Sequence, residues 1–238
     1  MNILATLQDG FNAIGLDVRK YPTKALNSRM RMLGNHGIDM VFDVGANQGQ
    51  YATELRKLGY RHSIVSFEPL SAAFATLDSK AADVDNWSAV NSAIGNVDGK
   101  IPINVSSNSV SSSILEISDE HVKAVPSSSV VGSEEVSIHK LSSIVDQWCP
   151  ADKKLFVKVD TQGYEKSVVE GAHDCMHRIS GFQLELSLTT LYAGEALFGD
   201  FIVMLKDYGF SLKGIEPGFY SPDNSELLQA DAIFYKDR

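Results

Sequence analysis

The chain has 238 residues, of which 44% are hydrophobic and 21% charged, and its formal net charge at pH 7 is −9. This length suits one large α/β domain with a sizeable core and is short for two full-sized domains. The acidic charge argues against general nucleic-acid binding, which depends on many cationic contacts with phosphates. Cys149 and Cys175 are far apart and predict neither a disulfide framework nor a zinc site, which fits a reducing cytoplasm.

No segment has the pattern of a secretion signal or a membrane anchor. The first residues lack a basic n-region, Asp9 interrupts their apolar run, and no apolar run elsewhere reaches the length of a bilayer span. We therefore expect a cytoplasmic protein that contacts membranes peripherally at most.

Residues 1–38 predict a helical extension with two helices. The second, "PTKALNSRMRMLGNHG", has Thr23 as N-cap and Gly34 as stop, and would pack on a sheet or cover a site. A basic cluster in this region predicts a solvated helix face or, alternatively, a docking site for a phosphate-bearing substrate or an anionic lipid surface. Its members are Arg19, Lys20, Lys24, Arg29 and Arg31.

Residues 39–238 alternate between strand and helix patterns. Strand-like runs cover 40–44, 63–69, 87–95, 100–106, 134–141, 154–160, 181–187, 210–217 and 227–235, with helices after 50, after 70, through 168–169 and near 196–208. This order predicts an α/β, Rossmann-like, doubly wound and mostly parallel sheet. Turn formers between the last two strands predict a hairpin and one antiparallel strand, which is the sheet of S-adenosylmethionine-dependent methyltransferases.

The serine-rich segment 106–135 lies between two predicted strands and has little periodicity. We expect a mobile flap or a short irregular helix over the cofactor face, with a plain surface loop as the alternative.

"DVGANQG", residues 43–49, follows an apolar strand and precedes a helix. Gly45 and Gly49 allow a tight turn against a ligand at the carboxyl end of the sheet. The second and third glycines of a dinucleotide fingerprint are missing, and Asp43 suits a positively charged ligand group better than a pyrophosphate. Glu68 ends the next strand, where an acid accepts both hydroxyls of a ribose.

The blocks "VFDVGANQGQY", "IVSFEPL", "VNSAIGNVDG", "SSSIL" and "LFVKVDTQGYEKSVVEGA" resemble, in this order, those of the FkbM-type methyltransferases. The resemblance implies S-adenosylmethionine as methyl donor and a hydroxyl acceptor on a small metabolite, glycan or glycolipid. The implied cofactor-binding residues are Asp43, Gly45, Ala46, Asn47, Gly49, Tyr51, Glu68, Pro69, Ser92, Ala93 and Asp160, with Glu68 on the ribose and Ser92 and Ala93 beside the adenine. The implied acceptor-binding residues are Ser112, Ser113 and Glu185.

The sequence departs from the family pattern at Ser142, where many relatives carry Asp, and at Gln162, where Glu is frequent. His139 is the residue type of a general base, but it falls within a strand-like run and is expected to be structural.

Methyl transfer needs an aligned acceptor oxygen and a group that takes its proton. Lys158 and Asp160 are two apart on a strand and share a face. We expect Asp160 to be the base, Lys158 to orient either Asp160 or the acceptor, and Glu165 to support them as a third catalytic residue. A rival mechanism holds Mg²⁺ between Asp160 and Glu185. No third ligand is visible in the sequence, so no metal site is predicted.

The sequence thus predicts an S-adenosylmethionine-dependent O-methyltransferase that does not bind nucleic acid. The alternatives are a nicotinamide-dependent Rossmann oxidoreductase and a non-catalytic relative that binds the cofactor. Acceptor identity and oligomeric state stay open.

Overall fold

The computed structural model describes residues 11, 13–16, 20–107, 112–115 and 128–237. The first predicted helix falls largely outside these residues. The second is α2 (Lys24–His36), and Thr23 caps it as predicted, its Oγ1 accepting a hydrogen bond from the Leu26 amide at 3.3 Å. The predicted stop at Gly34 is wrong. The helix ends at Gly37, which adopts the left-handed conformation (φ 64°) that closes a helix, whereas Gly34 stays helical.

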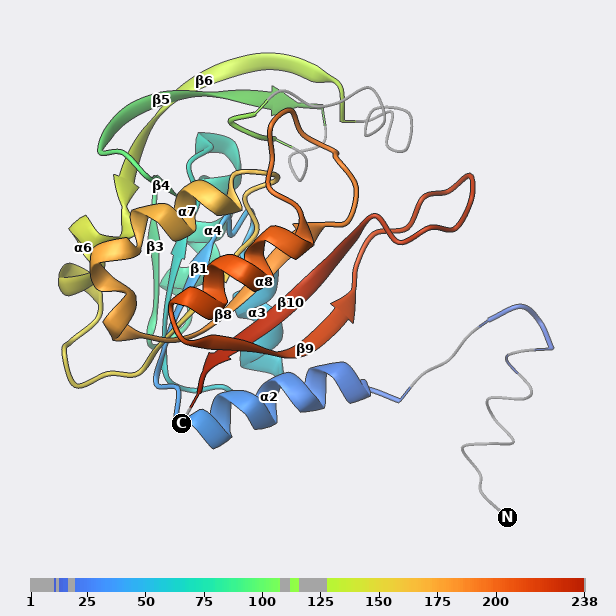
Figure 1. Cartoon of the computed structure of the whole chain (residues 1–238), viewed down its shortest axis with the longest axis horizontal. Helices are drawn as coiled ribbons and strands as arrows, with labels where there is room; N and C mark the ends of the chain where they lie inside the picture. The colour runs from blue at the N-terminus through green and yellow to red at the C-terminus, as the bar shows by residue number, and fades with distance from the viewer. Residues whose placement is uncertain (1–10, 12, 17–19, 108–111, 116–127, 238) are drawn as a thin grey trace.

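A seven-stranded sheet in the order β3-β2-β1-β7-β8-β10-β9 forms the centre of the molecule (Figure 1). All neighbouring pairs are parallel except those of β10, which is antiparallel to both β8 and β9. The fold class and the one antiparallel strand are confirmed. The strands are β1 (Met40–Val44), β2 (Ser63–Phe67), β3 (Trp87–Val90), β7 (Leu155–Val159), β8 (Ile179–Ser187), β9 (Phe210–Pro217) and β10 (Gln229–Lys236).

Three strands leave this sheet and form a second one in the order β4-β6-β5, which the sequence did not predict. They are β4 (Ala93–Gly95), β5 (Gly99–Ser106) and β6 (Val130–Lys140), and β5 and β6 arch above the central sheet in Figure 1. The predicted strand 87–95 is therefore split between the two sheets. Residues 130–135, expected to belong to a flap, are the first half of β6, while 108–111 and 116–127 lie outside the described residues.

Helices cover both faces of the central sheet. One face packs α6 (Leu141–Trp148), α7 (Glu165–Gly171), η3 (His173–Arg178) and α8 (Phe198–Asp207) against a core that includes Phe42 and Val44. The other face packs α2, α3 (Gln50–Lys57) and α4 (Ser71–Ala82) against Val41 and Phe156. Because side chains alternate along a strand, Asp43 and Lys158 lie on the α2–α3 face. Within the described residues, no helix is both long and apolar enough to cross a bilayer.

Candidate active site

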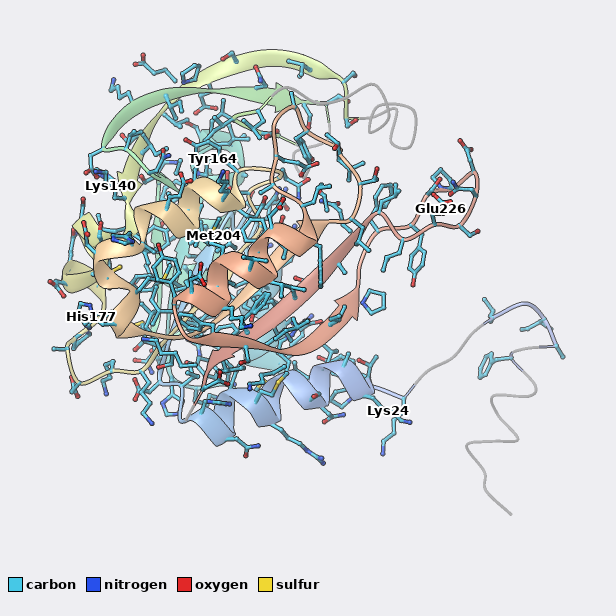
Figure 2. All side chains as sticks on the ribbon, viewed as in Figure 1. Lys24, Lys140, Tyr164, His177, Met204 and Glu226 are labelled. Atoms are coloured by element: carbon cyan, nitrogen blue, oxygen red, sulfur yellow. The ribbon has the colours of Figure 1, made fainter. Side chains whose placement is uncertain are left out.

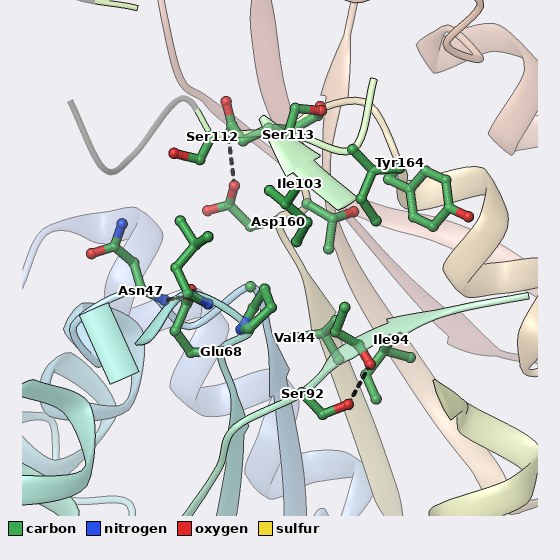
Figure 3. A pocket seen from close by; sticks show the side chains of 17 residues that line it. Val44, Asn47, Glu68, Ser92, Ile94, Ile103, Ser112, Ser113, Asp160 and Tyr164 are labelled. Atoms are coloured by element: carbon green, nitrogen blue, oxygen red, sulfur yellow. Dashed lines mark hydrogen bonds between the residues drawn. The ribbon is translucent and has the colours of Figure 1, made fainter. Parts of the chain in front are cut away.

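A cleft opens at the carboxyl ends of β1, β2 and β7, between the central sheet and the small sheet. Figure 3 shows Asn47, Glu68, Ser92, Asp160 and Tyr164 around it. Its lining comprises Val44, Gly45, Asn47, Glu68, Pro69, Leu70, Ser92, Ala93, Ile94, Ile103, Ser112, Ser113, Ile114, Asp160, Thr161, Gln162 and Tyr164. Leu70, Ala93 and Ile103 belong to the core cluster beneath the small sheet, so that sheet builds one wall.

The predicted glycine loop forms the floor of the cleft. Gly45 has a φ of 75°, and a Cβ there would lie 1.8 Å from the carbonyl oxygen of Asp160, so only glycine fits. Gly49 has a φ of 79°, but a Cβ on it would meet the Trp87 ring at 2.8 Å. Gly49 is thus required by packing under α4 and does not line the cleft, where the sequence had placed it.

Glu68 is buried, and backbone amides fix both of its carboxylate oxygens. Oε2 accepts from the Asn47 amide at 2.8 Å, and Oε1 accepts from the Leu70 amide at 2.9 Å. Burial raises the pKa of Glu68 to about 7, although the two amides oppose the shift. Each oxygen has a second lone pair for a hydroxyl group in the cleft.

Asp43 is fully buried at the end of β1. Its Oδ2 accepts from the Ser66 hydroxyl at 3.1 Å, and Ser66 in turn accepts from the Trp87 indole. Its Oδ1 has no hydrogen-bond partner and lies 3.7 Å from the Lys158 ammonium nitrogen. Burial raises the pKa of Asp43 despite that ammonium. Asp43 lines neither cavity, and the cation nearest to its Oδ1 is Lys158, so any effect of Asp43 on a bound cofactor would act through the loop and Lys158.

A second, more polar cavity, the polar hollow, joins the cleft at Gly45, Asn47 and Asp160. It lies between α2, α3 and the α2–α3 face of the sheet, and it is lined by Arg29, Gly45, Ala46, Asn47, Gln50, Tyr51, Glu54, Lys158, Asp160, Gln183 and Asp231. Tyr51 donates to Gln183 Oε1 at 3.1 Å, and Gln183 donates to Asp231 Oδ1 at 3.0 Å.

Arg29 corrects the expectation of a solvated basic face. It is buried and makes ion pairs with Glu54, at 2.8 Å, and with Glu216 on β9. Lys20, Lys24 and Arg31 are exposed, and Figure 2 shows Lys24 projecting away from the body of the protein. Arg19 lies outside the described residues. Arg29 therefore ties α2 to α3 and β9, and it is not available to dock a phosphate.

Lys158 and Asp160 meet as predicted, with 3.0 Å between the Lys158 ammonium and Asp160 Oδ2. Burial alone would raise the pKa of Asp160, but Lys158 and the neighbouring Glu185 and Gln162 groups lower it below its usual range. The Lys158 side chain is 8% exposed and that of Asp160 30%, so the carboxylate faces the cavities and the ammonium stands behind it. The pKa of Lys158, which burial would lower, is raised by Asp160 and Asp43.

Glu165 does not line either cavity. Its Oε1 accepts from the Thr161 amide at 2.8 Å, the Thr161 hydroxyl at 3.1 Å and the Gly163 amide at 3.3 Å. Burial raises the pKa of Glu165 to about 7, which the bonded amides oppose. We expect it to hold the 161–163 turn and not to touch an acceptor.

The remaining predicted residues divide between the cavities and other places. Pro69, Ser92, Ala93, Ser112 and Ser113 line the cleft, and Ala46 and Tyr51 line the polar hollow. Glu185 stands behind Gln162, which donates to its Oε2 at 2.6 Å. His139 lies on β6, 3.6 Å from Asp98, outside both cavities, and Ser142 lies on α6.

Sequence reasoning missed several residues of the site, among them Ile103, Tyr164, Gln183, Tyr192 and Asp231. Ile103 and Tyr164 reach the cleft only because the small sheet folds over it. Gln183 lies two residues before Glu185 on a predicted strand. A polar side chain within that apolar run was the signal that could have identified it as a site residue. The described residues contain no group of three or more His, Cys, Asp or Glu side chains placed to hold a metal ion.

The residues present fit an adenosyl amino-acid cofactor. Glu68 offers acceptors for two ribose hydroxyls, and the apolar wall beside Ala93 and Ile103 suits a flat base. The carboxylates of Asp160 and Asp231 in the polar hollow suit an ammonium group. The bend at Gly45 brings the backbone close enough for contact with such a ligand.

Comparison with known proteins agrees with this geometry. A family model described as "Methyltransferase FkbM domain" matches residues 43–212. A search of curated proteins gave no match.

Among solved structures, the chain resembles the methyltransferase FkbM from Methylobacillus flagellatus, with a TM-score of 0.52 and 13% identity over 83% of this chain and 44% of that one. This chain thus spans less than half of that protein. It also aligns with the TrmK of M. capricolum in complex with S-adenosyl-homocysteine (TM-score 0.49, 8% identity, 92% of this chain and 70% of that one).

A further structure, a TehB-like methyltransferase from Corynebacterium glutamicum, aligns over 98% of this chain and 96% of its own, with a TM-score of 0.44 and 14% identity. The structural likeness shows the fold, and the family model, which covers well over half of the chain, shows the family. The chain belongs to the FkbM methyltransferase family.

Proposed function

We propose that the protein is an S-adenosylmethionine-dependent O-methyltransferase that methylates a hydroxyl group of an uncharged small molecule, glycan or glycolipid. The observation that carries the proposal is the junction of the two cavities at Asp160. An accessible carboxylate, held by a buried lysine, stands where the apolar cleft meets the polar hollow.

The adenosine would occupy the cleft, with its ribose on Glu68 and its base against Ala93 and Ile103. The amino-acid end would lie over Gly45 toward Asp43 and the polar hollow. The junction would then lie beside the cofactor's sulfonium, which when bound supplies an activated methyl group and leaves as a neutral thioether. The protein has to align an acceptor oxygen with that methyl group, and alignment alone can contribute several kcal/mol.

Asp160 would accept the hydroxyl proton as the oxygen–methyl bond forms and would later release it to solvent. Lys158 holds Asp160 ionised and oriented. A carboxylate with a lowered pKa is a weak base, so its main contribution is to orient the hydroxyl and to stabilise its developing positive charge.

The charges around the junction support an uncharged acceptor. Both described cations of the polar hollow, Arg29 and Lys158, are already in ion pairs, while Asp231 and Asp160 add negative charge. A phosphate or carboxylate on the acceptor would meet no free cation among the described lining residues and would be repelled. Hydroxyl groups, in contrast, can donate to these carboxylates.

Calorimetry with S-adenosylhomocysteine, with NAD as the competing ligand, tests the cofactor. Tight NAD binding without S-adenosylhomocysteine binding would establish the oxidoreductase alternative. A radiolabelled-methyl screen over hydroxylated saccharides and lipids, each paired with its phosphorylated counterpart, tests the acceptor. Cofactor binding without transfer to any neutral hydroxyl compound would instead support the non-catalytic alternative.

A further inference from the structure

Gln162 occupies the turn that follows β7 in an unusual conformation. Its φ of 55° is left-handed, a region that glycine enters freely and that glutamine enters at a cost of about 1–3 kcal/mol. The Ser113 hydroxyl donates to its carbonyl oxygen at 2.6 Å, which fixes the backbone. A strained residue at a site needs a compensating interaction, and here the side chain supplies it.

The Gln162 carboxamide uses both of its N–H groups and one lone pair of its oxygen on named partners. Its Nε2 donates to Asp160 Oδ1 at 2.7 Å and to Glu185 Oε2 at 2.6 Å, and its Oε1 accepts from the Tyr192 hydroxyl at 2.5 Å. Tyr192 is fully buried, and Gly163 allows its approach, because a Cβ at 163 would lie 2.7 Å from Tyr192 Cβ. The orientation of the amide is therefore determined, with both N–H groups toward the carboxyls.

One amide thus bridges two carboxyl groups that would otherwise repel each other. Burial and the adjacent Asp160 raise the pKa of Glu185 far above its usual range, whereas Lys158 keeps Asp160 ionised. Protonation therefore favours Glu185 over Asp160, and the amide donates to one oxygen of each. The charged and polar groups around this pair are Lys158, Asp43, Asp231 and Tyr192.

We propose that Gln162 is a positioning residue whose carboxamide bridges Asp160 and Glu185 and keeps the free edge of Asp160 turned toward the acceptor. This inference rests on the proposed function for its kinetic consequence, because the acceptor hydroxyl is what Asp160 would meet. Its structural part, the amide bridge between the two carboxyls, belongs to the protein without cofactor or acceptor.

The test uses Gln162→Leu, which keeps the size of the side chain and removes both donors, and Gln162→Glu, which adds a third carboxyl. Gln147→Ala, an exposed glutamine on α6, is the matched control. In the ligand-free wild type, a ¹³C-carboxyl NMR titration should show the raised pKa of Glu185 beside those of the other buried carboxyls, and Glu185→Gln should identify its signal by removing it. In Gln162→Leu the pKa of Glu185 should rise further, because the ionised carboxyls lose the two N–H donors of the amide. In Gln162→Glu it should rise more again, because a third carboxyl adds negative charge.

For the full reaction, Gln162→Leu should lower kcat about tenfold or more, with a smaller change in the acceptor KM, and should shift the acidic limb of the kcat profile upward by about one pH unit. Gln147→Ala should match wild type. A Gln162→Leu protein that is less stable but keeps the wild-type carboxyl titration and pH profile would overturn the proposal, since Gln162 would then be structural only. Failure of wild type to bind S-adenosylhomocysteine would sink the proposed function and leave the titration result to decide on Gln162.

Discussion

Replacing Glu68 by alanine removes the carboxylate that we propose binds the ribose. Both of its oxygens are fixed by the Asn47 and Leu70 amides, so the carboxylate is preorganised and pays little entropy on binding. A hydrogen bond to a charged group contributes about 1.5–3 kcal/mol, which corresponds to one to two orders of magnitude in the dissociation constant. We expect Glu68→Ala to weaken S-adenosylhomocysteine binding by this amount.

The raised pKa of Glu68 gives the prediction a second signature. With a pKa of about 7 in the free protein, the carboxylate that accepts the ribose hydroxyls is mostly protonated at pH 6 and mostly ionised at pH 8. Wild-type affinity should therefore rise about tenfold between these values, whereas Glu68→Ala should show no such rise. In the ligand-free protein, the pH dependence of stability has the opposite sign to the pH dependence of affinity. The folded state holds a proton that the unfolded state has lost between pH 4.5 and about 7, so this group lowers stability by about 3 kcal/mol as the pH rises through that window.

Calorimetric titrations at pH 6, 7 and 8 measure the affinity, and urea denaturation across the window from pH 4.5 to about 7 measures the stability. Glu226→Ala, in the exposed loop before β10 (Figure 2), is the matched carboxylate control and should behave as wild type. If Glu68→Ala bound the ligand within about twofold of wild type at pH 8, or kept the rise in affinity, the ribose assignment would be refuted.

Three further perturbations test other parts of the site. Asp160→Asn should lower turnover by roughly 10²–10⁴-fold with little change in the cofactor dissociation constant, and an unchanged rate on the acceptor found by the screen would contradict its role. Gly45→Ala should lower the melting temperature and abolish cofactor binding, because its Cβ would lie 1.8 Å from a carbonyl oxygen, whereas Gly132→Ala, with open space around it, should not. Arg29→Ala should lower the free energy of unfolding by about 3 kcal/mol, because it leaves Glu216 and Glu54 unpaired. The control, Arg31→Ala on the exposed side of α2, should lower it little. Equal effects of the two substitutions would show that the buried ion pairs do not anchor α2.

The sequence predicted local structure most accurately at positions where a residue type has a single structural role. Thr23 caps α2 because its hydroxyl accepts from an amide of the first turn, and Gly45 turns the chain after β1 because its φ of 75° suits few other residues. Gly34 was wrongly predicted to end α2, whereas a cofactor-binding role of Gly49 stays a prediction. A glycine in a sequence does not say whether it is needed for its φ, for close packing or not at all, and at Gly49 the answer lies in the Trp87 ring from a distant strand.

The sequence alone determined the strand–helix order, the acids at the ends of β1 and β2, and the pairing of Lys158 with Asp160, since these follow from side-chain periodicity and short spacings. Only the tertiary structure decided that three strands form a separate sheet over the cleft, that Arg29 is buried between two glutamates, and that Gln162 joins Asp160 to Glu185. Those facts depend on contacts between residues 23 to 187 positions apart. Such contacts depend on how the whole chain buries its apolar side chains and pairs its charges, and no short segment of the sequence specifies this.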